Sequence, residues 1–282
     1  MNILKFIESF TNEGLMAATG SRRDSFTQFG NLGKNLAFAS IPFGLSALAN
    51  KAMAQDITAT PATPIGALQF ALTLEYLENE FYAMALDSGV IPASENGGRD
   101  LKVFQQIADH EADHVKFLIA GLGGTMSANF VPKPTFDFTV GGAFDPFGDY
   151  PTFLALAQAF EDTGVRAYKG RAPELVQGGD LLTAALRIHS VEARHAAKIR
   201  IMRRAYGSGI GDVKPWITGN MSNINSQAVQ PSYNGEENTV QLGIQIVGIN
   251  GLDISADDAT EAFDEPLSKE QVLAIVSNFI KP

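Results

Sequence analysis

The sequence contains no cysteine, and this absence removes whole classes of protein chemistry. None of its 282 residues can form a disulfide, ligate an iron–sulfur cluster, act as a thiol nucleophile or bind zinc through a thiolate. A cysteine-based electron-transfer module is excluded for the same reason. Any metal ion must therefore be held by carboxylate and imidazole groups, a mixture compatible with iron, manganese or zinc.

Positive charge is also scarce. The chain has 21 lysine and arginine residues against 31 aspartate and glutamate residues, which gives a formal net charge of −10 at pH 7. Binding to nucleic acid is not expected, because no basic face is available to neutralise phosphates. An acidic surface favours the approach of cations, although it can serve solubility alone.

The first 54 residues are typical of an export signal rather than of a folded domain. An arginine pair, Arg22-Arg23, precedes an uncharged stretch at 36–49, and its 14 residues are too few for a permanent bilayer span. Residues 52–54 then offer a small-x-small site that a signal peptidase could cut. The segment resembles a twin-arginine signal, so we expect an exported, periplasmic protein without a stable membrane span. A retained amphipathic N-terminal helix is the alternative.

Four segments carry apolar residues at the spacing of an amphipathic helix. They cover residues 64–88, 100–121, 151 to a turn at 170–179, and 180–206. Helices of this length are about 30–40 Å long, which suits a bundle with a site near mid-height. The sequence therefore predicts an all-α four-helix bundle.

The connections predict how these helices pair. Short segments at 89–98 and 170–179 favour antiparallel packing of the first with the second helix and of the third with the fourth. The long segment 122–150 between helices two and three predicts a crossover from one pair to the other. Residues 136–140 alternate within it and predict a short strand.

Beyond residue 207 the composition changes to glycine, serine and asparagine. The alternation at 240–246 predicts one strand, which could pair with the crossover strand. Ser268 and Gln271 predict a capping box that opens a short final helix to Ile280. We therefore expect three parts: an export signal at 1–54, the bundle at 55–206, and a mostly irregular extension at 207–282 packed on the bundle.

Glutamate and histidine recur in the same order in both halves of the predicted bundle. Glu-x-x-His occurs twice, and each copy is preceded by a helix in which a glutamate lies seven residues before a tyrosine. The residues in chain order are Glu75, Tyr82, Glu111 and His114, then Glu161, Tyr168, Glu192 and His195. The glutamates and histidines of this set all fall inside apolar stripes, although charged residues usually face solvent.

Helical geometry explains how these residues could hold two metal ions. Residues three apart share one helix face, so each Glu-x-x-His can offer one ion a carboxylate and an imidazole. The remaining two glutamates can complete or bridge a pair of ions about 3.5–4 Å apart. Four carboxylates also neutralise two divalent ions in a buried site. The predicted metal ligands are Glu75, Glu111, His114, Glu161, Glu192 and His195.

Several neighbours of this set have weaker signals. Tyr82 and Tyr168, each two turns from its glutamate, are expected to hydrogen-bond to the ligands. His189 lies one turn before Glu192 of the second Glu-x-x-His. It could hydrogen-bond to a ligand or have no role at the site, and the sequence leaves both alternatives open. Glu78 is an alternative ligand, whereas His110 is expected either at the surface or beside the ligands.

Residues 64–206 resemble the ferritin-like superfamily of carboxylate-bridged two-metal proteins. Residues 68–82 and the tail segment 261–267 are similar, more narrowly, to the ferritin-like domain proteins that include plant desiccation-related proteins. The resemblance implies that the six predicted ligands bind the metals and that the protein is exported. The long crossover and the tail differ from compact cage ferritins, so a storage shell is not expected.

Two classes of function remain open at this point. The leading hypothesis is a redox protein with two iron or manganese ions that handles oxygen or peroxide in stress protection. Iron would favour ferroxidase-like chemistry, and manganese would favour catalase-like chemistry. The alternative is a non-catalytic, metal-stiffened bundle that binds or protects other molecules, or one that sequesters metal. The broad faces of such a bundle would also allow a homodimer.

Overall fold

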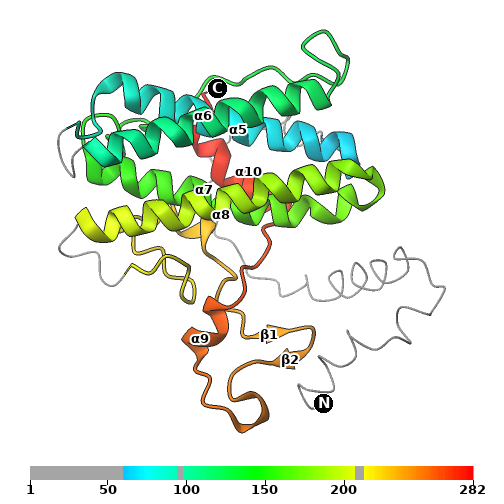
Figure 1. The fold of residues 1–282 in the computed structure, drawn as a ribbon, viewed down its shortest axis with the longest axis vertical. Helices are drawn as coiled ribbons and strands as arrows, with labels where there is room; N and C mark the ends of the chain where they lie inside the picture. Colours follow the sequence, from blue (N-terminus) through cyan, green and yellow to red (C-terminus); the bar gives the residue numbers. More distant parts are fainter. Residues whose placement is uncertain (1–59, 94–97, 207–212, 282) are drawn as a thin grey trace.

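The computed structural model describes residues 60–93, 98–206 and 213–281. Its four long helices are α5 (Pro64–Ser88), α6 (Arg99–Gly121), α7 (Tyr150–Leu175) and α8 (Asp180–Tyr206). They lie side by side as a bundle (Figure 1). The predicted all-α bundle is confirmed, and the predicted export signal at 1–54 lies outside the described residues.

Local sequence sets the starts of two of these helices. Thr63 caps α5, because its hydroxyl accepts a hydrogen bond from the Gly66 N–H at 3.1 Å, and a proline follows at the first helical position. Asp149 caps α7 in the same way, accepting from the Thr152 N–H at 2.9 Å. These caps satisfy N–H groups that have no partner inside the helix.

Two helix pairs form the bundle. Helix α5 packs on α6 and α7 packs on α8, while α5 also contacts α7 across the pairs. The segment between α6 and α7 crosses over, as predicted. The Phe81 ring is wholly buried, and it packs against Phe153 and Phe160 of α7 at centroid distances of 5.2 and 4.9 Å. Burial of one such side chain contributes about 1.5–3 kcal/mol.

The predicted turn at 170–179 begins too early. Helix α7 continues through Gly170 and Pro173 to Leu175, and a 3₁₀ turn, Val176–Gly178, then leads into α8. Gly170 provides room rather than a helix end: a Cβ atom there would lie 1.9 Å from the Leu267 carbonyl oxygen. The glycine therefore allows the C-terminal segment to touch the backbone of α7.

The predicted strand at 240–246 is instead a hairpin of β1 (Val240–Gln241) and β2 (Ile244–Gln245). Leu242 and Gly243 between them have φ values of 52° and 77°, as a two-residue hairpin turn requires. The alternating residues 240–246 therefore form two short antiparallel strands joined by a tight turn, and not one strand.

The crossover strand predicted at 136–140 is reduced to one bridge between Phe136 and Ile280. Its neighbours extend the contact, since the Asp137 N–H donates to the Phe279 carbonyl at 2.8 Å. The suggested pairing with residues 240–246 is wrong, because the end of the chain occupies this place.

The extension also contains two helices. Helix α9 (Ala256–Glu261), which was not predicted, begins at a capping box of Ser255 and Asp258. Helix α10 (Lys269–Val276) begins at the predicted capping box and continues into a 3₁₀ turn, Ser277–Phe279. The hairpin and α9 project from the bundle, whereas α10 lies against α7 (Figure 1).

Shorter 3₁₀ turns occur at Gln230–Ser232 and Ile249–Gly251. Across the described residues, no helix combines the length and the apolar character needed to cross a bilayer.

Candidate metal centre

The structure brings the six predicted ligand residues together near the middle of the bundle. Helix α5 supplies Glu75, α6 supplies Glu111 and His114, α7 supplies Glu161, and α8 supplies Glu192 and His195. We call these six residues the metal cluster. All four of its glutamates are 0% exposed, a burial that isolated carboxylates almost never show.

The cluster consists of two overlapping groups of ligand atoms. One is formed by Glu75, Glu111, His114 and Glu192, and the other by Glu111, Glu161, Glu192 and His195. Within each group the ligand atoms all lie within 4.8 Å of one another. Glu111 and Glu192 belong to both groups, and each group adds its own histidine and its own outer glutamate.

Both histidines direct Nδ1 at the carboxylates. His114 Nδ1 lies 3.0 Å from Glu111 Oε2, 3.1 Å from Glu75 Oε2 and 3.3 Å from Glu192 Oε1. His195 Nδ1 lies 2.9 Å from Glu111 Oε1 and 3.3 Å from Glu161 Oε2. The two oxygens of Glu111 thus face different histidines.

Unsatisfied polar atoms mark the centre of the cluster. The buried atoms that make no well-aligned hydrogen bond include Glu111 Oε1, Glu161 Oε2, both carboxylate oxygens of Glu192, and His195 Nδ1, although His195 Nδ1 lies within 3.3 Å of the Glu111 and Glu161 oxygens. Leaving such an atom unpaired costs about 1–3 kcal/mol, and native proteins rarely do so. These oxygen and nitrogen atoms fit hard or intermediate metal ions, which would satisfy them together.

The pKa values reflect the excess of negative charge. Burial raises the pKa of Glu75 to about 7, although its contact with His114 acts in the opposite direction. Burial and the neighbouring Glu111 raise the pKa of Glu192 well above its ordinary value. Burial lowers the pKa of His114, but its hydrogen bonds to Glu111 and Glu75 outweigh this effect and raise the pKa to about 10. Without metal the cluster therefore retains protons.

The two tyrosines hold the outer glutamates crosswise. The Tyr82 hydroxyl on α5 donates to Glu161 Oε1 on α7 at 2.5 Å, and the Tyr168 hydroxyl on α7 donates to Glu75 Oε1 on α5. Each tyrosine thus contacts the glutamate of the other half. Each fixes one oxygen of its glutamate, and the other oxygen faces the cluster.

The remaining histidines differ in their contacts. His110 Nδ1 lies 2.9 Å from His195 Nε2, and the two rings stack with centroids 5.2 Å apart. His110 thus holds the far side of a predicted ligand. Among the described residues His189 makes no hydrogen bond with the cluster, and the charges that act on it are those of Lys169 and Asp264.

Glu78 is a fifth buried carboxylate beside the cluster. It is 4% exposed, and burial followed by the charge of Glu161 raises its pKa well above the ordinary value. A Cβ atom on Gly164 would lie 3.2 Å from both Glu78 Oε1 and Glu192 Oε2, so this glycine makes room for the two side chains. The spacing of three residues from Glu75 was the only sequence signal for this position.

A second set of buried charges lies behind the cluster, and we call it the arginine network. Arg200 of α8 donates two hydrogen bonds to Asp162, from Nε at 3.1 Å and from a terminal nitrogen at 2.5 Å. Tyr233 in the extension donates to the same carboxylate at 2.8 Å. Arg203 of α8 donates to Gln158 and, at 2.9 Å, to the Asn223 carbonyl.

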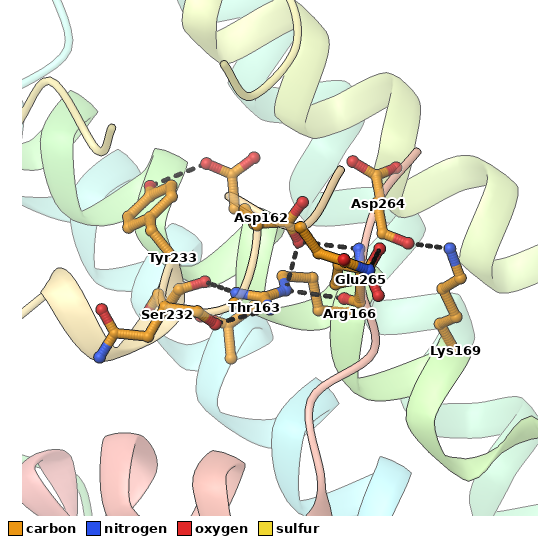
Figure 2. A network of polar contacts seen from close by, with 12 residues as sticks. Asp162, Thr163, Arg166, Lys169, Ser232, Tyr233, Asp264 and Glu265 are labelled. Atoms are coloured by element: carbon orange, nitrogen blue, oxygen red, sulfur yellow. Dashed lines mark hydrogen bonds and ion pairs between the residues drawn. The ribbon is translucent and has the colours of Figure 1, made fainter. Parts of the chain in front are cut away.

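Arg166 of α7 extends this network to the tail. It donates to the carbonyl groups of Ser232, Asn234 and Glu265 at 2.6, 2.9 and 2.8 Å, and its Nε lies 2.6 Å from Glu236 Oε1. Figure 2 shows α7 meeting the segments around Tyr233 and Glu265 through these contacts. No motif in the sequence indicated this network, which attaches the extension to the bundle.

Comparison with protein families adds independent support for the fold. The family model described as a ferritin-like domain matches residues 63–205, about half of the chain. Comparisons with curated proteins and with solved structures gave no match. The matched range begins at the cap of α5, ends in the last turn of α8 and contains the whole metal cluster. The chain belongs to the ferritin-like domain family.

Proposed function

We propose that this protein is an exported two-metal redox protein that uses iron or manganese to handle oxygen or peroxide in stress protection. The observation that carries the proposal is the metal cluster with its unsatisfied buried atoms. Membership of the ferritin-like family supports a metal-binding role for the cluster.

The residues divide the work of holding two ions. Glu111 and Glu192 would bridge them, while each ion would take one histidine and one outer glutamate. When bound, the two ions would supply two electrons, which with two protons reduce dioxygen to hydrogen peroxide or hydrogen peroxide to two water molecules; a second hydrogen peroxide that returns two electrons and two protons would leave as dioxygen. Glu78 is a further buried carboxyl group beside the cluster, and its raised pKa favours the form that holds a proton close to the ions.

Burial and hydrogen bonding prepare the site before any ion arrives. Tyr82 and Tyr168 hold Glu161 and Glu75, so the outer ligands need little rearrangement on binding. His110 restrains the His195 ring from its other side. The four glutamates are wholly buried, so the packed helices around them keep bulk water away from the reacting centre.

The decisive experiment combines metal loading with turnover. Metal-free protein would be loaded with ferrous or manganous ions without oxygen, and the bound metal counted by elemental analysis. We expect two ions per chain, oxygen consumption by the iron form or oxygen release from peroxide by the manganese form, and loss of both in Glu111→Gln. Asp113→Asn is the matched control, since its side chain lies on the same helix but is 75% exposed.

The outcomes separate the functions. Binding of two ions without turnover by either metal would overturn the redox role and support the non-catalytic, metal-stiffened bundle. Loading of many more than two ions per chain would support metal sequestration. Failure of the wild type to bind either metal would overturn all three.

The export part of the proposal rests on the sequence of the first 54 residues. The double substitution Arg22→Lys and Arg23→Lys should stop transport on the twin-arginine route and leave the full chain in the cytoplasm of its host. Fractionation of wild-type cells should find the protein in the periplasm. A cytoplasmic wild type would contradict export.

A further inference from the structure

An apolar cavity lies beside one end of the metal cluster. It is bounded by all four helices, and the empty space in it and in front of it, with open solvent included, is about 430 Å³. Four of its lining residues are alanines: Ala67, Ala71, Ala167 and Ala185. It has room for roughly one or two molecules of the size of water.

Tyr168 connects this cavity to the metal cluster. Its side chain lines the cavity, and its hydroxyl donates a hydrogen bond to Glu75. Phe117 of α6 also lines the cavity and is 43% exposed, so part of the lining reaches the surface. The cavity thus leads from the surface to a side chain that touches a predicted ligand.

The opposite end of the cluster is filled. Tyr82 occupies the place there that Tyr168 occupies beside the cavity, and it is 0% exposed. Its ring packs against Phe81, Phe104 and Phe153 with centroids 5.5, 5.9 and 6.2 Å away. The ligands are therefore arranged with near two-fold symmetry, whereas their surroundings differ: aromatic rings pack around Tyr82, and the cavity lies beside Tyr168.

The chemistry of the lining selects the molecule that could use this path. Arg171 is the one charged lining residue, and it already pairs with Glu174 at 2.8 Å and lies over the Phe70 ring at 5.0 Å. An anion would therefore gain little there. Such an apolar lining offers water few hydrogen bonds and suits small uncharged, apolar molecules. Dioxygen meets this description, whereas hydrogen peroxide would lose its hydrogen bonds to water.

We propose that this cavity binds dioxygen and admits it to the Tyr168–Glu75 side of the metal cluster. This inference rests on the proposed redox function and narrows it, because dioxygen rather than peroxide becomes the oxidant that the bundle admits. The side chains of Ala71 and Ala185 must then be small so that dioxygen can reach the metal cluster, and not only so that the helices can pack.

Xenon pressurisation of crystals of the metal-free protein tests the cavity without any redox chemistry. Xenon should bind between Tyr168 and Ala185 in the wild type and be lost in Ala185→Leu. Ala184→Leu is the matched control. Ala184 is next to Ala185 in the sequence, but its side chain is only partly buried and does not line the cavity. Absence of xenon from the wild-type cavity would overturn the proposal.

The second measurement follows oxidation of the ferrous-loaded protein after rapid mixing. With dioxygen, Ala185→Leu should react about tenfold more slowly than the wild type, while the rate with peroxide and the number of bound ions stay unchanged. Ala71→Val, which fills the cavity from α5, gives the same test if the first variant fails to fold. Equal rates with dioxygen in a variant that has lost the xenon site would overturn the access role.

The two proposals can fail separately. A wild type that binds xenon but is oxidised by neither oxidant would refute the redox function. A wild type that is oxidised by peroxide alone would retain the redox function and refute dioxygen as the molecule admitted.

Discussion

The metal cluster and the arginine network lie next to each other on α7 and α8, and they treat buried charge in opposite ways. Glu161 and Asp162 are consecutive residues and both are buried, at 0% and 3% exposure. Asp162 accepts two hydrogen bonds from Arg200, whereas Glu161 accepts one from Tyr82 and shares His195 with Glu111. In the network each carboxylate has a guanidinium partner, but in the cluster carboxylates face other carboxylates.

This difference distinguishes a structural device from a binding site. A buried ion pair with good geometry is complete, so removal of one partner leaves an uncompensated charge. A group of buried carboxylates is incomplete and takes up protons or metal ions to neutralise its charge. The network should therefore contribute to the free energy of unfolding with or without metal. The contribution of the cluster should depend on the protons or metal ions that it binds.

The largest effect is expected in the network. Arg200→Ala should lower the free energy of unfolding by about 3–5 kcal/mol, because Asp162 would remain buried without its charge partner. Urea denaturation of the metal-free protein measures this change. Arg204→Ala, an exposed arginine on the same helix, should change it by less than about 0.5 kcal/mol. A loss below about 1 kcal/mol in Arg200→Ala would contradict the structural role.

The pH dependence of the metal-free protein should give the next largest effect. The pKa of Glu75 is raised from 4.5 to about 7, so the native state holds more protons than the unfolded state between these values and loses stability as pH rises. The pKa of His114 is raised from 6.5 to about 10, so the stability it contributes is also lost as pH rises. Together they predict that the free energy of unfolding falls as the pH rises from about 5 to about 9.

Bound metal should remove this fall, because it displaces the protons. Urea denaturation of metal-free and manganese-loaded protein across the same pH range tests this statement. Stability of the metal-free protein that rises with pH would show that the cluster is not an excess of buried negative charge. Asp113→Asn, on the exposed side of α6, should leave the slope unchanged.

A pair of glycine substitutions separates the two regions. Gly170→Ala should cost about 1–3 kcal/mol and expose the extension to proteases, because the new Cβ would lie 1.9 Å from the Leu267 carbonyl. Gly164→Ala should instead weaken metal binding, since its Cβ would crowd Glu192 and Glu78. Limited proteolysis and metal titration of both variants should give opposite patterns. Identical patterns would mean that cluster and network are one structural unit.

The sequence predicted those features that depend on local spacing. The helical period placed Glu111 and His114 on one buried face, and Ser268 with Gln271 marked the start of α10. It could not predict the arginine network, because the partners of Arg166 lie at least 66 residues away, in irregular segments. The crosswise contacts of the tyrosines likewise depend on how two helices pack, which no local pattern encodes.

The smallest expected effect tests the symmetry within the cluster itself. Tyr82→Phe and Tyr168→Phe each remove one hydrogen bond to an outer glutamate, and each should weaken metal binding about tenfold. Equal losses are expected because the two contacts are equivalent, although only Tyr168 lines the cavity. Tyr76→Phe is the control, since its hydroxyl donates only to the Val131 carbonyl, at 3.4 Å. If calorimetric titration with manganese finds a loss in only one of the two variants, the ions do not share the two halves of the cluster evenly. The ligands would then be asymmetric, as their surroundings are. The contacts of the arginine network should be unaffected in either variant, because they do not depend on metal.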